Sequence, residues 1–349
     1  MTERSHIAKA RRIVVKIGSR ALAEGGAQER LARDIATLRG MQKSVVLVSS
    51  GAIALGLKKL GWKKRPKEIA KLQAAAAAGQ TVLMRSYEEA FDAHDIPVAQ
   101  VLLTHADLAD RTRANNARAA LAELLGAGAI PVLNENDSVA VDEIRFGDND
   151  QLASMVTPLA DADLLILLSD VAGVLDADGE RISLVRDFSE IAPHIKKSGN
   201  DLGTGGMASK AEAARRAALA GVGVVIANAK ESLVSIAAGD DIGTLFVPSK
   251  SRMSARKYWI AFTTRPRGDV ILDRGASHAV RTKNTSVLAV GVLGVRGAFD
   301  AGDPLRLMDP DGAEIGRGLT RMKAEEILRV AGTKDAGVVV HRDELVVVV

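Results

Sequence analysis

The chain has 349 residues, of which 47% are hydrophobic and 26% are charged, and it contains no cysteine. A chain of this length is expected to form two domains, and the lack of cysteine excludes a disulfide framework, a thiolate metal site and a cysteine nucleophile. No apolar run approaches the roughly 20 residues that a membrane-spanning helix needs, and the basic start lacks the apolar segment of a secretory signal. We therefore expect a protein of the cytoplasm.

The formal net charge of +4 comes from one short segment. Residues 1–248 contain 30 basic and 31 acidic side chains, residues 249–267 contain 6 and 0, and residues 268–349 contain 11 and 12. The basic segment also contains Trp259 and Pro266, and we interpret it as a connector between two domains. The near-neutral flanking regions do not favour a nucleic-acid partner.

Short apolar runs alternate with longer helical stretches through the first 248 residues. The runs are rich in Val, Ile and Leu, as strands buried on both faces should be. They are residues 12–17, 45–48, 98–103, 129–133, 164–168 and 222–227, and the helical stretches include 31–41, 68–93, 115–126 and 208–220. This alternation predicts an α/β fold with three layers, in which helices cover both faces of a parallel-rich sheet. Ligands of such sheets bind at the carboxyl ends of the strands.

The first two strand ends have loops suited to binding an anion. In VVKIGSR, Lys16 stands at the end of a strand, where it can reach a phosphate as a point charge or simply extend into solvent. In VVLVSSGAIALG, a strand is followed by two serines, a glycine and an apolar helix. The amides at that helix start and the Ser50 hydroxyl suit a carboxylate or a phosphate, although an ordinary turn capped by serine fits nearly as well.

Residues 134–150, NENDSVAVDEIRFGDND, concentrate carboxylates and amides directly behind the run 129–133. So polar a cluster at the end of a strand favours ligand binding over folding stability. It could receive the amino group of a small zwitterion, hold a hydrated magnesium ion, or position lysines for phosphoryl transfer. The segment alone leaves all three roles open.

Two further loops follow later strands. Ser169 and Asp170 close the apolar run DLLILL, and the DADG after them fits a turn better than a calcium loop, which would need later ligands and a terminal Glu. GTGGMASK, residues 203–210, stands directly before the helix AEAARRAALA. Its glycines let the chain fold around an anion, while the helix amides and Lys210 supply hydrogen bonds and charge. The sequence differs from the common P-loop pattern.

From residue 269 onward, short segments are separated by Gly and Asp turns, which predicts a small, mostly antiparallel barrel or sandwich. Residues 309–312 have the turn chemistry of a hairpin. HRDEL, residues 341–345, imitates part of the protein-kinase catalytic loop. It lacks the Asn at the required offset and a DFG partner, so we assign it to a strand.

Taken in this order, VVKIG, SSGAIALG, LNENDSVA, GDNDQLA and LGTGGMASK resemble the motifs of the amino acid kinase family, and in particular of its members that act on glutamate. The resemblance continues through RKYWI and into a tail similar to a PUA domain, which includes GAFDAGD. It implies a catalytic domain over residues 1–248, a basic connector over 249–267 and a mostly-β, PUA-like barrel over 268–349. The implied reaction is ATP-dependent phosphorylation of the side-chain carboxylate of L-glutamate, which opens proline synthesis.

The resemblance also implies which side chains carry the reaction. Lys16 and Lys210 would flank the transferring phosphoryl group, and Asp148 and Asp150 would orient the lysines and the substrate amino group. No general base is needed, because a carboxylate is already an ionised nucleophile. Magnesium is expected mainly on the nucleotide phosphates, and no direct metal ligand is assigned.

The substrates would be held by residues from the same loops. Those implied for glutamate are Ser50, Asp137 and Asn149. Those implied for the nucleotide are Lys16, Ser169, Asp170, Thr204, Gly205, Gly206, Met207, Ala208, Ser209 and Lys210. Two departures stand beside this set. The family commonly has a small hydroxyl residue in place of Arg20, and the segment after Asp170, LDADGERIS, is shorter than usual.

Two other functions stay open at this point. A member of the same family could act on aspartate, acetylglutamate, carbamate or a nucleotide, and a PUA-like tail could belong to an RNA-binding or RNA-modifying protein. Against RNA stand the 11 basic and 12 acidic residues of the tail and the 3% aromatic residues of the chain, which leave few stacking platforms. The resemblance further implies a homo-oligomer, a dimer or a tetramer, and inhibition by proline at or near the glutamate site.

Overall fold

The computed structural model describes residues 3–139, 148–197 and 206–347. The chain divides into two compact units, Met1–Arg252 and Met253–Val349. Residues 253–267, which the sequence suggests are part of a connector, therefore pack with the second unit.

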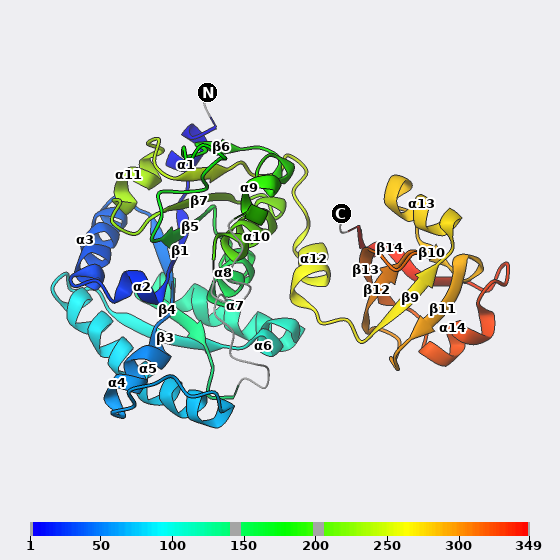
Figure 1. The fold of residues 1–349 in the computed structure, drawn as a ribbon, viewed down its shortest axis with the longest axis horizontal. Coiled ribbons are helices and arrows are strands. Elements are labelled where there is room, and N and C mark those ends of the chain that lie inside the picture. The colour runs from blue at the N-terminus through cyan, green and yellow to red at the C-terminus, as the bar shows by residue number, and fades with distance from the viewer. Residues whose placement is uncertain (1–2, 140–147, 198–205, 348–349) are drawn as a thin grey trace. The chain divides into compact units, whose positions relative to one another are not determined.

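In the described part of the first unit, eight strands form one sheet in the order β3-β4-β2-β1-β5-β7-β8-β6 (Figure 1). Neighbouring strands run parallel, with the exception of β7 and β8. The strands are β1 (Arg12–Ile17), β2 (Ser44–Ser49), β3 (Val98–Leu103), β4 (Ile130–Glu135), β5 (Leu164–Ser169), β6 (Leu184–Val185), β7 (Gly223–Asn228) and β8 (Thr244–Phe246). The predicted parallel-rich sheet is confirmed.

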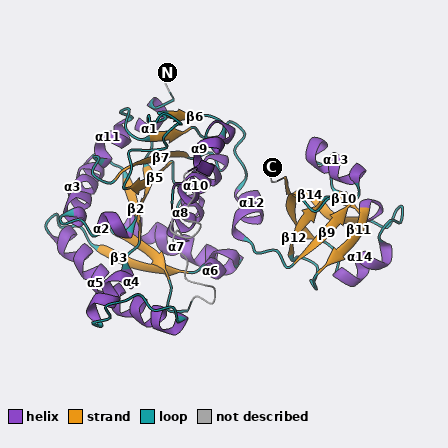
Figure 2. Cartoon of the chain, viewed as in Figure 1, coloured by secondary structure: helices purple, strands orange, loops and turns teal. Residues whose placement is uncertain are grey.

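Helices cover both faces of this sheet (Figure 2). They are α1 (Ser5–Ala8), α2 (Ser19–Leu22), α3 (Ala27–Gly40), α4 (Ala52–Lys59), α5 (Ile69–Asp92), α6 (His105–Ala109), α7 (Arg111–Gly126), α8 (Asp148–Leu159), α9 (Ala192–Lys197), α10 (Met207–Leu219) and α11 (Leu233–Ala238). Residues of α3, α5 and α11 share one core cluster, whereas α8 and α10 lie on the other side of the sheet (Figure 1). The GDND run, expected in a loop, instead begins α8 at Asp148.

The alternation of side chains along β1 decides which of them face the functional side of the sheet. Ile13, Val15 and Ile17 belong to the core cluster that also contains α3. Because successive residues of a strand point to opposite faces, Val14 and Lys16 point toward the face of α8 and α10. The lysine that ends this apolar strand is thus directed at the helices that follow the acidic and glycine-rich segments.

Helices α4 and α5 pack backbone to backbone through two glycines. A Cβ added at Gly79 would lie 1.7 Å from the carbonyl oxygen of Ala52, and one added at Gly56 would lie 1.7 Å from that of Ala75. Contacts this close exclude any side chain at either position. These two contacts fix the position of α5 along the axis of α4. They therefore also fix α5 relative to the Ser50 loop, which directly precedes α4.

The second unit has its own hydrophobic core under a curled sheet. Six strands are described there, in the order β10-β14-β13-β12-β9-β11, and most neighbours run antiparallel. They are β9 (Gly268–Leu272), β10 (Val287–Leu288), β11 (Val292–Arg296), β12 (Pro304–Met308), β13 (Glu314–Thr320) and β14 (Val338–Val347). The helices are α12 (Ala255–Tyr258), α13 (Arg274–Lys283) and α14 (Ala324–Val330).

Two sequence features of the second unit have the structure expected of them. The hairpin between β12 and β13 turns at Asp309, whose Oδ1 accepts hydrogen bonds from the N–H groups of Asp311 at 3.1 Å and Ala313 at 2.8 Å. The kinase-like HRDEL segment lies within β14. The helices α13 and α14 were not expected from the sequence, which was interpreted there as a series of short strands.

Candidate functional site

Three charged side chains meet at the carboxyl edge of the first sheet. Lys16 Nζ lies 2.6 Å from Oδ1 of Asp150, and Lys210 Nζ lies 3.4 Å from Oδ2 of the same carboxylate. The relative exposures are 4% for Lys16, 0% for Asp150 and 8% for Lys210. One buried carboxylate therefore holds two ammonium groups, which come from β1 and from the first turn of α10.

Burial lowers the pKa of Lys16 below its usual value, the nearby Asp150 raises it in part, and the neighbouring Lys210 lowers it further. Charge is costly to bury unless it is paired, and here Asp150 pairs with both cations. The two ammonium groups therefore converge on one largely enclosed place. An anion bound between the two lysines would interact with both of them, as the oxygens of a transferring phosphoryl group do.

Ser50 and Asn149 form the second part of the site. Asn149 Nδ2 donates a hydrogen bond to Ser50 Oγ at 3.0 Å and another to Asn134 Oδ1 at 3.2 Å. Gly51, next to Ser50, has φ +105, a left-handed conformation that favours glycine. This conformation lets the chain turn from β2 into α4, which brings the serine to the start of α8.

Asp137 lies in the turn after β4. Arg65 lies in the segment between α4 and α5, and the charge of Asp137 affects its pKa. Burial lowers the pKa of Arg65, and Asp137 raises it in part. The structure thus brings a cation from a distant segment within electrostatic range of the aspartate to which the resemblance assigns glutamate binding.

Ser169 and Asp170 stand at the end of β5. Ser169 Oγ donates to Asp170 Oδ1 at 3.1 Å, and Arg20 Nη1 lies 3.4 Å from Asp170 Oδ2. Arg20 is the residue that departs from the usual small hydroxyl of the family. Its ion pair joins the first loop to the end of β5, although both side chains are exposed, so the pair contributes little stability.

The glycine-rich segment ends in helix α10. Gly206 is the N-cap, and the backbone N–H groups of Ser209 and Lys210 donate to its carbonyl oxygen at 3.1 and 3.4 Å. Met207 and Ala208 are the first residues of the helix. Thr204 and Gly205 lie outside the described residues, as does the side chain of Asp148.

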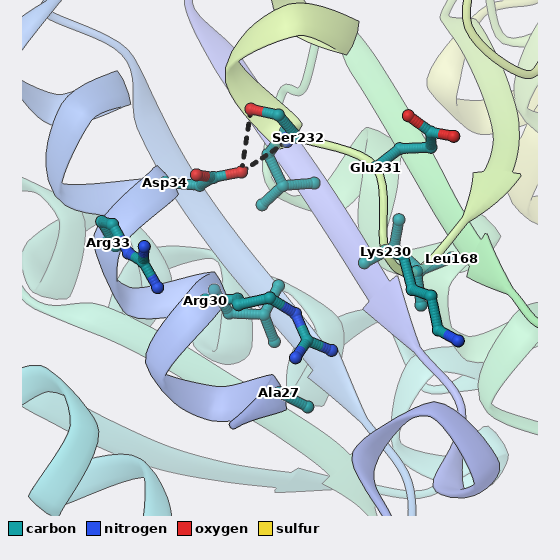
Figure 3. A pocket seen from close by; sticks show the side chains of 11 residues that line it. Ala27, Arg30, Arg33, Asp34, Leu168, Lys230, Glu231 and Ser232 are labelled. Atoms are coloured by element: carbon teal, nitrogen blue, oxygen red, sulfur yellow. Dashed lines mark hydrogen bonds between the residues drawn. The ribbon is translucent and has the colours of Figure 1, made fainter. Parts of the chain in front are cut away.

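A cavity of about 140 Å³ lies near the carboxyl end of β5, on the α3 side (Figure 3). Its wall includes Arg30, Lys230 and Asp34. Asp34 Oδ2 accepts hydrogen bonds from Ser232 Oγ at 3.1 Å and from the N–H of Leu233 at 2.6 Å. This aspartate therefore anchors the start of α11, which is a structural task.

The described residues contain neither a cluster of metal-binding side chains nor a membrane-spanning helix. In residues 3–139, 148–197 and 206–347, no group of three or more His, Cys, Asp or Glu side chains is placed to hold a metal ion. Within the same ranges, no helix combines the length and the hydropathy of a membrane span.

Of two side chains behind the site, Gln80 was missed as a functional candidate and Asn134 was included only as a member of the cluster 134–150. Gln80 of α5 is 8% exposed and Asn134 of β4 is 2% exposed, and Asn134 Nδ2 donates to Gln80 Oε1 at 2.9 Å. A signal for Gln80 is present in the sequence, since it is a polar residue at the end of the run AAAAAG. Its partner, 54 positions away, could not be read from the sequence.

Comparison with known proteins gives relatives of the whole chain. The model of the Amino acid kinase family matches residues 11–228, and that of the PUA domain matches residues 268–342. A Glutamate 5-kinase of Burkholderia ambifaria is 46% identical, and the match covers 99% of this chain and 100% of the relative. A Glutamate 5-kinase of Trichlorobacter lovleyi is also 46% identical, with 98% of each chain covered.

Proposed function

The chain belongs to the amino acid kinase family, and from this premise we propose that it transfers the γ-phosphoryl group of ATP to the side-chain carboxylate of L-glutamate. The products are gamma-glutamyl phosphate and ADP, and the reaction is the first step of proline biosynthesis. The structural observation that carries the proposal is the buried carboxylate of Asp150 between Lys16 and Lys210. The choice of glutamate as the substrate rests on the relatives, which match over nearly their full length.

The reaction requires alignment and charge neutralisation. A side-chain carboxylate oxygen of glutamate bonds to the γ-phosphorus while the bond from that phosphorus to the β–γ bridging oxygen breaks, and ADP leaves. Lys16 and Lys210 approach the phosphoryl oxygens from two elements and stabilise the charge that develops there. Asp150 fixes both ammonium groups, so that little reorganisation is needed at the moment of transfer.

We assign glutamate binding to Ser50, Asp137 and Asn149. Ser50 and Asn149 are already hydrogen-bonded to each other, so the site is partly organised before substrate binds. A hydroxyl donor suits a substrate carboxylate, and an aspartate or an amide oxygen suits the ammonium group. Asp148 remains a proposed partner in orienting the amino group.

The nucleotide is assigned to Ser169, Asp170 and residues 204–210, together with Lys16. The N-terminus of α10 supports this, because the first N–H groups of a helix and its dipole favour phosphate. Each oxygen of Asp150 faces a lysine, so we expect magnesium to be held mainly by the nucleotide phosphates. When bound, the ion neutralises phosphate charge.

The remaining proposals come from the resemblance. We propose that residues 1–248 form the catalytic domain, that residues 249–267 connect it to the PUA-like residues 268–349, and that the enzyme acts as a dimer or a tetramer. Proline is proposed as a feedback inhibitor at or near the glutamate site. We place the enzyme in the cytoplasm, where both substrates are available.

An assay of ADP release with different acceptors tests the proposed function. Glutamate, aspartate, acetylglutamate and carbamate are each supplied with Mg-ATP, and ADP is measured by a coupled reaction. We expect glutamate to stimulate turnover far above the rate without acceptor. Turnover with another acceptor and none with glutamate would refute the proposal.

A further inference from the structure

A chain of amide hydrogen bonds runs from the surface of the first unit into the proposed glutamate site. Gln80 Nε2 donates to Gln100 Oε1 at 3.3 Å, and Gln80 Oε1 accepts from Asn134 Nδ2 at 2.9 Å. Asn134 Oδ1 then accepts from Asn149 Nδ2 at 3.2 Å, and Asn149 Nδ2 also donates to Ser50 Oγ at 3.0 Å. From Asn149 through Asn134 and Gln80 to Gln100, each amide therefore donates to the next.

One backbone N–H group identifies which side-chain atom of Asn134 is the oxygen, and therefore the direction in which these amides donate. The N–H of Glu135 donates to Asn134 Oδ1 at 2.9 Å. A backbone N–H can only donate, so the atom of Asn134 that faces it must be the oxygen. The amide of Asn134 then has its nitrogen toward Gln80, and the atom of Asn149 that faces Asn134 Oδ1 must be a nitrogen. The backbone N–H holds the oxygen side of the Asn134 amide and Gln80 Oε1 holds its nitrogen side, so the two contacts together orient Asn134 and, through it, Asn149.

The direction of the chain decides what the site offers to a ligand. Both N–H bonds of Asn149 are used, and its Oδ1 is buried with no hydrogen-bond partner among the described residues. A buried oxygen in this state is costly unless a ligand or water satisfies it. Ser50 Oγ already accepts from Asn149, which leaves its proton to donate. The site thus presents one acceptor and one donor, as a bound α-amino acid requires.

We propose that Gln80, acting through Asn134, is a positioning residue that orients the Asn149 amide so that Oδ1 faces the ammonium group of the substrate. This inference rests on the proposed function and adds to it the source of selectivity for an amino acid. Gln80, a buried residue of α5, is linked to Asn149 through the side chain of Asn134.

The backbone of α5 is held in the position from which Gln80 can reach Asn134. Gly79, the residue before Gln80, packs against the carbonyl oxygen of Ala52 at a distance that admits no side chain. Ala52 is the first residue of α4 and lies two positions after Ser50. Gln80 and Ser50 are therefore fixed relative to each other by main-chain contact.

The test compares two ligands in three variants of the full-length protein. Gln80→Met removes the acceptor of Asn134 Nδ2 at similar side-chain length. Gln80→Glu retains an acceptor, since a buried glutamic acid that stays protonated can accept from Asn134 and donate to Gln100. Gln100→Met is the matched control, because it removes only the exposed end of the chain. The ligands are L-glutamate, measured by its KM, and glutarate, which lacks the ammonium group, measured as a competitive inhibitor.

We expect Gln80→Met to raise the glutamate KM roughly tenfold, the effect of leaving a buried amide without its partner, with the KM for ATP unchanged. Glutarate inhibition should change by less than about twofold, because glutarate never uses Asn149 Oδ1. Gln80→Glu should recover most of the glutamate affinity, and Gln100→Met should behave as the wild type.

Three results would overturn the inference. Equal weakening of glutamate and glutarate in Gln80→Met would show a general structural role, and an unchanged glutamate KM would show no role. A wild type that binds glutarate as tightly as glutamate would remove the selectivity to be explained. A wild type that turns over another acceptor and not glutamate would instead overturn the proposed function, and the inference with it.

Discussion

At the scale of single residues, the most consequential feature is the sharing of one carboxylate by two lysines. Removing Asp150 would take away the carboxylate that both buried lysines contact, which is strongly destabilising. Removing one lysine leaves an ion pair intact and takes away one of the groups that stabilise the transition state. The two kinds of substitution therefore differ, the first acting on the fold and the second on the chemistry.

We predict that Lys16→Ala and Lys210→Ala each lower kcat by about 10²–10³, the usual effect of losing one preorganised electrostatic group. The KM for glutamate should change little, because the lysines act on the phosphoryl group. Steady-state kinetics measure both constants, and Lys9→Ala, at an exposed position, serves as the control. Near-normal kcat in both variants would contradict the assigned roles.

The pH dependence follows from the pKa of Lys16, which burial lowers from the usual value of 10.5. The charged form is present below the lowered pKa and is lost as pH rises through it. We therefore predict that kcat/KM for ATP falls at a pH below 10.5 and recovers when the pH is returned. Circular dichroism at each pH shows whether the fold persists. A constant kcat/KM up to that pH would refute the argument.

At the scale of elements, the packing of α4 on α5 connects stability with the site. A Cβ at Gly79 would lie 1.7 Å from the carbonyl oxygen of Ala52, so one helix backbone must move. The loop with Ser50 lies directly before α4, and Gln80 follows Gly79. Any shift between these helices therefore disturbs the hydrogen bonds of Asn149.

We predict that Gly79→Ala lowers the free energy of unfolding by about 3 kcal/mol, near the upper end of overpacking effects, and raises the KM for glutamate. Gly126→Ala is the matched control, because nothing lies within 4 Å of a Cβ at that helical position. The control should be neutral or slightly stabilising. Urea unfolding measures the free energies, and equal stability of the two variants would contradict the packing argument.

The sequence predicted those elements whose pattern is local. β1 and β3 have the bounds of their predominantly apolar runs, although β3 is only partly buried and contains the exposed Gln100. The start of α8 was missed because GDND has the composition of a loop. The chain of amide hydrogen bonds from Gln80 to Asn149 was missed for a different reason. Its hydrogen bonds depend on how α5, β4 and α8 pack.

At the scale of the whole molecule, each unit has a hydrophobic core of its own, and each matches one family. The residues assigned to catalysis all belong to the first unit, Met1–Arg252. The relatives named Glutamate 5-kinase match both units, so the second unit is part of the same enzyme architecture. Its near-neutral charge gives no support to RNA binding as the main function.

The most direct test is to trap the product. An acyl phosphate reacts with hydroxylamine to give a hydroxamate, so the full-length protein is incubated with Mg-ATP, L-glutamate and hydroxylamine, and gamma-glutamyl hydroxamate and ADP are quantified by mass spectrometry. The account predicts one hydroxamate for each ADP in the wild type, and almost none with Lys16→Ala or Lys210→Ala. Glutamate-dependent ADP release without hydroxamate, or hydroxamate formation undiminished in both lysine variants, would contradict it.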